Sequence, residues 1–443
     1  MLHSISPVDG RYGDKTAPLQ SYFSEAALMR YRVRVEIDYL IALIETGIIK
    51  NHKLTDEERI ALKKVVSDFS DEDALRIKAI ESKINHDVKA IEYFVKEKLD
   101  GANLGHLREW VHFGLTSQDI NNTAFPLMIK AAYLEVIIPE YMSARQAIFD
   151  MAQSTSHVAM MAYTHGQPAS PTRLGKEMMV FVERLDSQIA QLEKTELKVK
   201  FGGATGNFNA HHASFPEVNW IEWADHFTHK YLNVERYRYT TQIEHYDQLA
   251  ALCHVTMRLN TILVDFCRDM WSYISMNYLR QKANPDEVGS SAMPHKVNPI
   301  DFENAEGNLG YANAIFGHLA DKLPVSRLQR DLTDSTVLRN IGVPVAHTFL
   351  ALTSMQKGLK KISPNEEMIA QDLDNNWTVL AEAIQTILRR EGVANPYELL
   401  KDLTRGKEKI NKESIHAFIQ QLNVDDRIKK ELFQLTPAGY TGV

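Results

Sequence analysis

The sequence predicts an all-α protein in which three helical domains surround a long central helix bundle that is shared between subunits. Apolar residues recur every three or four positions over long stretches, which is the spacing of one helix face. One stretch keeps this spacing for more than three heptads, while strand patterns are nearly absent. Helices of that length need partners along their whole surface, and a shared antiparallel bundle provides them.

The longest helices are expected in the middle of the chain. One apolar stripe alternates steps of three and four residues: Leu249, Leu252, Thr256, Leu259, Leu263, Phe266, Met270 and Tyr273. A second stripe has the same spacing: Leu174, Met178, Phe181, Leu185, Ile189 and Leu192. Cys253 and Cys267 fall within the first helix, where their separation corresponds to a rise of about 21 Å. A disulfide cannot span that distance, so both cysteines are expected to be reduced.

Three domains are expected: an N-terminal helical domain over 1–110, a central long-helix bundle over 111–363 that carries an irregular loop at 281–301, and a C-terminal helical domain over 364–443. In the first domain, a helix over 24–44 ends before Gly47. Residues 55–58 (Thr-Asp-Glu-Glu) have the form of a capped helix start. In the last domain, a helical stripe runs over 377–388.

Composition limits the classes of function. The chain has 443 residues, of which 44% are hydrophobic and 24% charged, as in soluble globular proteins. The net charge of -7 argues against general binding of nucleic acids or anionic membranes, although it leaves room for a local basic pocket. The polar N-terminus is not a signal peptide, and no apolar run is expected to approach the length of a membrane span. A cytoplasmic protein is therefore expected.

The most irregular stretch runs over 289–299, with the sequence Gly-Ser-Ser-Ala-Met-Pro-His-Lys-Val-Asn-Pro. Its glycine and two prolines bend the backbone. Two hydroxyls, an imidazole, an ammonium and an amide crowd into it. A loop of this kind is either a functional lid or a solvated connector.

Two polar stretches precede predicted helices. An Asn or Asp at the position of Asn85 or Asp87 is more often a helix cap than a ligand contact. His86, between them, is expected to have no capping role, which favours a functional one. Thr116 and Ser117 are ordinary N-cap candidates as well as possible ligand contacts.

Other candidates lie at breaks in the bundle. His165 is expected at a Gly/Pro break between two long helices, where a histidine is as often functional as structural. The glycine-rich residues 202–207 lack the Lys-Ser/Thr ending of a phosphate-binding loop, so a closely packed or substrate-lining turn is expected. Arg330, Ser335 and Arg339 form either an anion cradle near a helix start or a set of surface ion pairs.

Together these motifs resemble the signature of the fumarase/aspartase superfamily, whose members eliminate fumarate from a succinyl group. Within it, the chain closely resembles the bacterial form of the adenylosuccinate lyase family over essentially its whole length. The motifs that carry the resemblance are 6–12 (SPVDGRY), 85–87 (NHD), 116–119 (TSQD), 164–168 (THGQP), 289–299 (GSSAMPHKVNP) and 335–339 (STVLR). The loop alone specifies only the superfamily. His295 points away from fumarase and aspartase, which usually carry a small residue there.

The resemblance implies two reactions. Adenylosuccinate is cleaved to AMP and fumarate, and the succinyl-carboxamide ribonucleotide (SAICAR) to AICAR and fumarate, both by β-elimination across a C–N bond. A proton leaves the carbon beside a carboxylate, and the resulting dianion needs cations and donors placed in advance. The departing nitrogen must gain a proton. No electron sink beyond the protein is required, so no metal or organic cofactor is implied.

The resemblance also implies residue roles. Ser291 is the base, activated by Lys296, by loop N–H groups or by loop closure, while the adjacent Ser290 stays open as the alternative. His165 is the general acid for the leaving nitrogen. The other implied catalytic residues are His86 and Glu303. The implied substrate-binding residues are Arg11, Tyr12, Asn85, Asp87, Thr116, Ser117, Gln242, Met293, Asn298, Arg330, Ser335, Thr336 and Arg339.

The resemblance further implies a homotetramer whose sites are each built from three subunits, with small-molecule nucleotides as substrates and neither nucleic acid nor membrane as a partner. One alternative is an argininosuccinate lyase, which shares the loop but binds no nucleotide phosphate. Residues 11–12 and 335–339 argue against it. The other alternative is a catalytically silent helical scaffold. Such a protein has no need for the set of Ser291, His165, His86 and Lys296, and all four are present.

Overall fold

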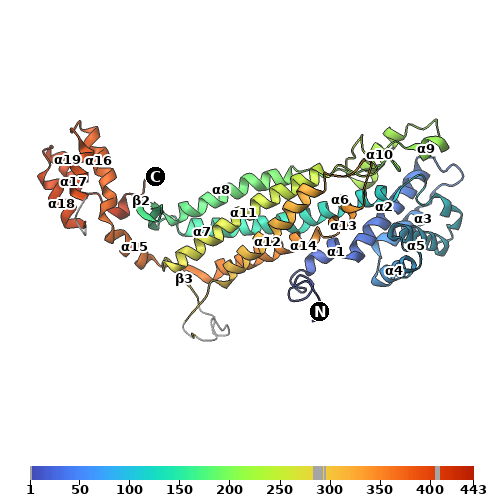
Figure 1. The fold of residues 1–443 in the computed structure, drawn as a ribbon, viewed down its shortest axis with the longest axis horizontal. Coiled ribbons are helices and arrows are strands. Elements are labelled where there is room, and N and C mark those ends of the chain that lie inside the picture. The colour runs from blue at the N-terminus through green and yellow to red at the C-terminus, as the bar shows by residue number, and fades with distance from the viewer. Residues whose placement is uncertain (1, 283–292, 294–295, 405–409) are drawn as a thin grey trace. The chain divides into compact units, whose positions relative to one another are not determined.

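The computed structural model describes residues 2–282, 293, 296–404 and 410–443. Helices dominate these residues, and the strands within them form two small antiparallel pairs (Figure 1). The predicted all-α class is therefore confirmed. The chain folds as two compact units: a first unit of Met1–Tyr141, Gln188–Thr261 and Gly307–Ala351, and a second unit of Met142–Ser187, Ile262–Glu306 and Leu352–Val443. The three-domain division proposed above stays a prediction.

The helical segments of the first unit are α1 (Ala17–Phe23), α2 (Glu25–Glu45), α3 (Asp56–Ser67), α4 (Asp71–Ile84), α5 (Asp87–Gly101), η1 (Gly105–Trp110), α6 (Ser117–Ala132), the π-helical turn η2 (Tyr133–Ile137), α9 (Asn209–Ser214), α10 (Trp220–Leu232) and α13 (Thr333–Leu338). The division between the units falls within α7 (Ile138–Ser154), α8 (Leu174–Glu193), α11 (Asp247–Ser275), α12 (Ile300–Lys322) and α14 (Gly342–Lys361).

The second unit adds the strands β1 (Ala159–Thr164), β2 (Gln167–Arg173), β3 (Leu279–Gln281) and β4 (Ile362–Pro364), and the helical segments α15 (Glu366–Asn375), η3 (Trp377–Val379), α16 (Leu380–Arg390), α17 (Pro396–Thr404), α18 (Lys412–Gln421), α19 (Asp426–Phe433) and η4 (Pro437–Gly439). Leu380, Ile384 and Leu388 of α16 pack with Ile415 and Ile419 of α18 in one buried cluster. The stripe predicted over 377–388 therefore forms the core of this part.

The predicted N-terminal helix is confirmed as α2. Ser24 Oγ accepts a hydrogen bond from the Ala27 N–H at its start, and Gly47 follows its end with a φ of +75°. The predicted capping box at α3 is also confirmed, since Thr55 and Glu58 bond each other's backbone N–H. The helix α2 is buried on nearly all sides rather than on one face. Its charged residues consequently need buried partners.

The predicted long heptad-like helix is confirmed as α11. Its stripe from Leu249 to Met270 is buried, and Cys253 and Cys267 are buried free thiols. By length and composition alone, α11 is long and apolar enough to cross a membrane, contrary to the expectation from the sequence. However, 61% of its most apolar window is buried inside the protein, which is the behaviour of a core helix.

One local prediction was wrong. Residues 164–168 do lie between two long helices, α7 and α8, but Gly166 and Pro168 end neither of them. They belong to a β-hairpin in which Thr164 pairs with Gln167. His165 and Gly166 are its two-residue turn, with φ values of +54° and +71°. Two consecutive positive φ angles are what a tight hairpin turn of type I′ requires, and glycine adopts them readily. His165 is thereby displayed at an exposed hairpin tip.

Candidate functional site

The predicted site residues divide between the two units. The first unit holds Arg11, Tyr12, Asn85, His86, Asp87, Thr116, Ser117, Gln242, Arg330, Ser335, Thr336 and Arg339. The second unit holds His165, Met293, Lys296, Asn298 and Glu303. Ser290 and Ser291 lie outside the described residues. The groups predicted to hold the phosphate or a carboxylate (Arg11, Tyr12, Arg330, Ser335 and Arg339) are thus in the first unit, and the predicted general acid His165 is in the second.

Three predicted substrate-binding residues meet around one guanidinium. Arg330 donates from Nη1 to Gln242 Oε1 at 3.2 Å and from Nη2 to Ser335 Oγ at 2.9 Å. Its Nε lies 3.6 Å from Asp334 Oδ1. Gln118, in the first turn of α6, donates to the same Ser335 hydroxyl at 3.4 Å. These contacts fix the direction of the guanidinium, as a preformed anion site requires.

Arg339, one helical turn after Ser335, is held by a residue 252 positions earlier. Its Nη2 donates to Asp87 Oδ2 at 2.7 Å, and buried Arg32 donates to the same oxygen at 2.9 Å. Arg32 Nε also donates to Asn121 Oδ1 at 2.8 Å. Arg339 itself remains about half exposed and lines a cavity of about 250 Å³.

The Asp87 carboxylate is an unsuitable direct contact for an anionic substrate. Partial burial raises the pKa of Asp87, but Arg32, Arg339 and the Val88 N–H outweigh burial and lower the pKa to about 2. The group is therefore ionised at neutral pH and already shared by two guanidiniums. Its geometry suits orientation of Arg339 rather than contact with a phosphate or carboxylate.

The roles of Asn85 and His86 at the helix junction differ from those expected. Asn85 ends α4 in the left-handed conformation, with a φ of +54°. His86, not Asn85 or Asp87, is the N-cap of α5, and its Nδ1 accepts from the Lys89 N–H at 3.1 Å. The prediction that His86 has no capping role was wrong. Because Nδ1 accepts, a neutral His86 carries its proton on Nε2, and its half-exposed ring can offer that N–H.

Thr116 and Ser117 form the start of α6, as predicted. The Thr116 N–H donates to Asp119 Oδ2 at 2.8 Å, and Ser117 is the first helical residue. Arg11 and Tyr12 stack on each other at 5.9 Å. Within the part of the chain that the structure describes, neither forms a hydrogen bond or ion pair with another predicted site residue. Thr336 is exposed on α13, where its carbonyl accepts from Asn340.

Apart from His165, the described site residues of the second unit lie near the start of α12 in the sequence. Glu303 accepts from Trp271 Nε1 at 3.1 Å. Lys296 is exposed, and its backbone N–H donates to the Met293 carbonyl at 3.1 Å. Asn298 is partly buried just before the helix.

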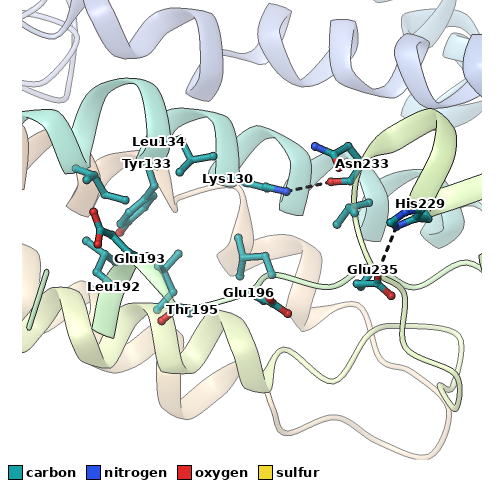
Figure 2. A pocket seen from close by; sticks show the side chains of 14 residues that line it. Lys130, Tyr133, Leu134, Leu192, Glu193, Thr195, Glu196, His229, Asn233 and Glu235 are labelled. Atoms are coloured by element: carbon teal, nitrogen blue, oxygen red, sulfur yellow. Dashed lines mark hydrogen bonds and ion pairs between the residues drawn. The ribbon is translucent and has the colours of Figure 1, made fainter. Parts of the chain in front are cut away.

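A well-formed cavity in the first unit contains none of the predicted site residues. It has a volume of about 270 Å³ and lies beside the π-helical turn η2 (Figure 2). Tyr133, Leu134 and Leu192 give it an apolar wall. At its edge, Lys130 donates to the Asn233 carbonyl at 3.0 Å and His229 pairs with Glu235 at 3.3 Å. Pocket size alone therefore does not identify the site that the motifs predict.

The prediction from sequence missed the buried polar residues that bind predicted site residues or the segments that carry them. These are Arg32, Asp119, Asn122 and Lys200. A signal existed for two of them. Asp119 occupies the capping position three residues after Thr116, and Lys200 directly precedes the glycine-rich turn. Nothing in the sequence indicated that Arg32 meets Asp87.

We expect Asp87→Asn to destabilise the protein by about 2–3 kcal/mol at pH 7, because the buried Arg32 guanidinium loses its charged partner. The matched control is Glu97→Gln, which breaks the exposed Arg76–Glu97 pair and should cost less than about 1 kcal/mol. Thermal or denaturant midpoints measure both.

The same carboxylate makes the stability depend on pH. The folded-state pKa of Asp87 is depressed, so its contribution to the free energy of unfolding is present above the unfolded pKa and is lost as pH falls toward about 2. Equal midpoints for the two variants at pH 7 would contradict this account.

Glu244 gives a second prediction with the opposite sign. Burial raises the pKa of Glu244 to about 8, although a hydrogen bond from the Tyr246 backbone opposes the rise. The folded protein therefore keeps this proton while the unfolded chain loses it, so stability falls as pH rises from about 4.5 to about 8. Glu244→Gln should match the parent at pH 4.5 and melt at a higher temperature at pH 8. The exposed Glu217→Gln should show no such divergence in the same series of melting curves.

Comparison with known proteins places this geometry in a family. The Lyase family model matches residues 10–317, and the model described as Adenylosuccinate lyase C-terminal matches residues 326–441. Adenylosuccinate lyase of Dictyostelium discoideum is 52% identical, and those of Vibrio cholerae and Escherichia coli are each 48% identical. Each alignment covers 100% of this chain and 97% of the relative.

Solved structures with low sequence identity show the same fold. A carboxy-muconate cycloisomerase of Acinetobacter calcoaceticus superposes with a TM-score of 0.72 at 18% identity, covering 96% of this chain and 94% of that one. A carboxy-muconate lactonizing enzyme of Pseudomonas putida gives 0.75 at 18% identity, covering 96% and 93%. With the family models and the full-length relatives, these matches establish that the chain belongs to the adenylosuccinate lyase family of the fumarase/aspartase superfamily.

Proposed function

We propose that the protein cleaves adenylosuccinate to AMP and fumarate, and SAICAR to AICAR and fumarate, by β-elimination. The observation that carries the proposal is the cluster in which the Arg330 guanidinium donates to the side chains of both Gln242 and Ser335. A guanidinium and a hydroxyl held in this way suit a phosphate or carboxylate. The full-length relatives are all named for this activity.

The reaction requires two proton transfers. A base removes a proton from the carbon beside a substrate carboxylate, the C–N bond breaks with its electron pair leaving on nitrogen, and an acid protonates that nitrogen. We assign the base to Ser291 and the acid to His165. Lys296 and Asn298 suit the developing dianion. His86 offers a further N–H, and we assign to Glu303 the orientation of a histidine.

We further propose that the protein works in the cytoplasm as a homotetramer, with each site drawn from three subunits. Two features support the assembly: the long helices α8, α11 and α12, and the exposure of His165 and Lys296 on a single chain. The substrates are then small nucleotides. No metal or organic cofactor takes part in the proposed chemistry, because the substrate carboxylate itself accepts the negative charge.

The test is the ultraviolet absorbance change of the purified protein with adenylosuccinate, with fumarate measured by an independent assay. Release of AMP and fumarate supports the proposal. Release of fumarate from argininosuccinate but not from adenylosuccinate would show that the protein is an argininosuccinate lyase instead. A well-folded protein that is silent on both substrates would favour a helical scaffold.

His165→Ala should reduce turnover by about 10²–10⁴-fold, the usual contribution of a general acid, while KM changes little because that group acts mainly in the transition state. His157→Ala is the matched control. It removes another exposed histidine of the second unit and should leave turnover unchanged. Steady-state kinetics on adenylosuccinate measure both variants. Undiminished turnover of the His165 variant would show that His165 is not the general acid.

A further inference from the structure

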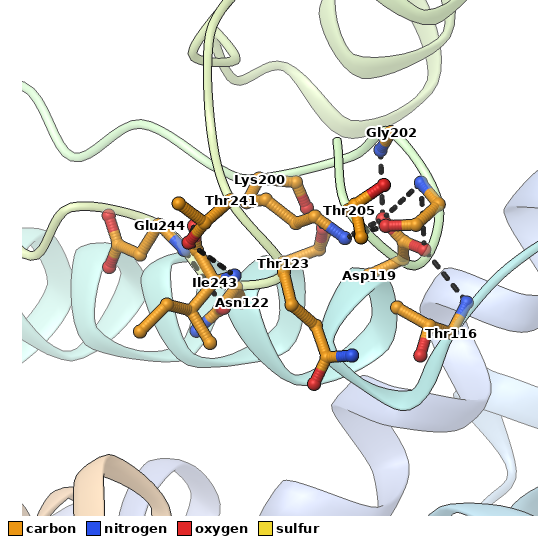
Figure 3. Close-up of polar contacts among 12 residues, drawn as sticks. Thr116, Asp119, Asn122, Thr123, Lys200, Gly202, Thr205, Thr241, Ile243 and Glu244 are labelled. Atoms are coloured by element: carbon orange, nitrogen blue, oxygen red, sulfur yellow. Dashed lines mark hydrogen bonds and ion pairs between the residues drawn. The ribbon is translucent and has the colours of Figure 1, made fainter. Parts of the chain in front are cut away.

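The first turn of α6 is joined to a distant turn by a completely buried ion pair (Figure 3). The Asp119 carboxylate accepts from three backbone N–H groups, those of Thr116 at 2.8 Å, Gly202 at 2.8 Å and Gly203 at 3.1 Å. Lys200 Nζ donates to Asp119 Oδ1 at 2.7 Å and to the Gly203 carbonyl at 2.5 Å. The pair therefore fixes the backbone of the glycine-rich turn directly against the start of α6.

The second turn of α6 binds further segments that carry predicted substrate contacts. Asn122 Nδ2 donates to Tyr246 Oη at 2.8 Å, and its Oδ1 accepts from the Glu244 N–H at 3.1 Å. Tyr246 Oη in turn donates to Asp334 Oδ2 at 2.9 Å. The segments that contain Gln242 and Ser335 are thereby tied to the same helix that begins with Thr116.

Stability alone gives little reason for the ion pair. Removing two charges from water costs about as much as their attraction returns, so an apolar pair of similar volume is often as stable. Burial lowers the pKa of Lys200 against the opposing effect of Asp119, which reflects that cost. What an apolar pair would lack is direction, because only the charged groups bind specific backbone N–H and carbonyl groups.

We propose that the Asp119–Lys200 pair is a positioning element for substrate binding, which holds Thr116, Ser117 and the turn over 202–206 in a single arrangement. The inference rests on the proposed function. Both side chains have no exposed surface, so they act through the backbone they bind and do not touch the substrate. A shift of about 1 Å in a binding group is enough to reduce catalytic efficiency by up to about 100-fold.

The test is a double-mutant cycle of Asp119→Asn, Lys200→Met and the double variant, with Tm and adenylosuccinate kinetics measured for each. Each single change leaves one buried charge without its partner, so Tm should fall. The double variant has no unpaired charge, so Tm should recover substantially. KM should rise about tenfold or more in all three variants, the double variant included. None of them keeps all four backbone contacts, which are those of Asp119 with the N–H groups of Thr116, Gly202 and Gly203 and that of Lys200 with the Gly203 carbonyl.

The control is Tyr141→Phe, which breaks the buried bond from Tyr141 Oη to Asn260 Oδ1 at 2.6 Å. Tm should fall while KM stays at the parent value. If KM of the double variant returns to the parent value together with Tm, the pair is only structural and the inference is overturned. Should these variants fail to fold, Lys200→Gln, which keeps a donor for the Gly203 carbonyl, is tested against the same criterion.

The parent protein separates the two hypotheses. If the parent does not cleave adenylosuccinate, the proposed function fails and the positioning role falls with it. If the parent is active but KM follows Tm throughout the cycle, only the positioning role fails.

Discussion

The polar groups on the first two turns of α6 determine where the other segments of the first unit lie. Asp119 and Asn122 bind the turn over 202–206, the segment after Gln242 and, through Tyr246, the segment around Asp334. These segments lie far from α6 along the chain: Gly202 is 83 positions from Asp119, and Tyr246 is 124 positions from Asn122. Buried donors and acceptors must be paired, so each segment has few alternative positions once α6 is packed.

A carboxylate lies beside two of the predicted guanidinium groups of the first unit, and another lies beside the buried Lys200. Asp334 lies beside Arg330, Asp87 binds Arg339, and Asp119 binds Lys200. A carboxylate next to a guanidinium weakens its net attraction for an anion, but it also removes the entropy cost of orienting a long side chain at the moment of binding. A chain with a net charge of -7 can thus bind a multiply charged anion. The strength of that interaction depends on the local charge and on the orientation of the guanidinium groups rather than on the net charge of the chain.

The sequence predicted the elements that depend on periodicity and capping. The stripe of α11, the start of α2 at Ser24 and the capping box of α3 were all identified, because 3.6-residue spacing and cap chemistry are local. The hairpin at His165 was not, since Gly and Pro mark a turn without specifying what it joins. The partnership of Asp87 with Arg32 and Arg339 depends on tertiary packing between residues 55 and 252 positions apart, and no local signal encodes it.

The exposure of His165 bears on how the proposed chemistry becomes possible. The turn places the imidazole at the tip of a hairpin whose residues 163–168 are all exposed. A general acid is most effective where water is excluded, because solvent competes for its proton and weakens the field around it. The described residues of a single chain leave this tip exposed. In the proposed tetramer, a neighbouring subunit that covered the hairpin would shield the histidine and bring it to a substrate held by the guanidinium groups of another chain.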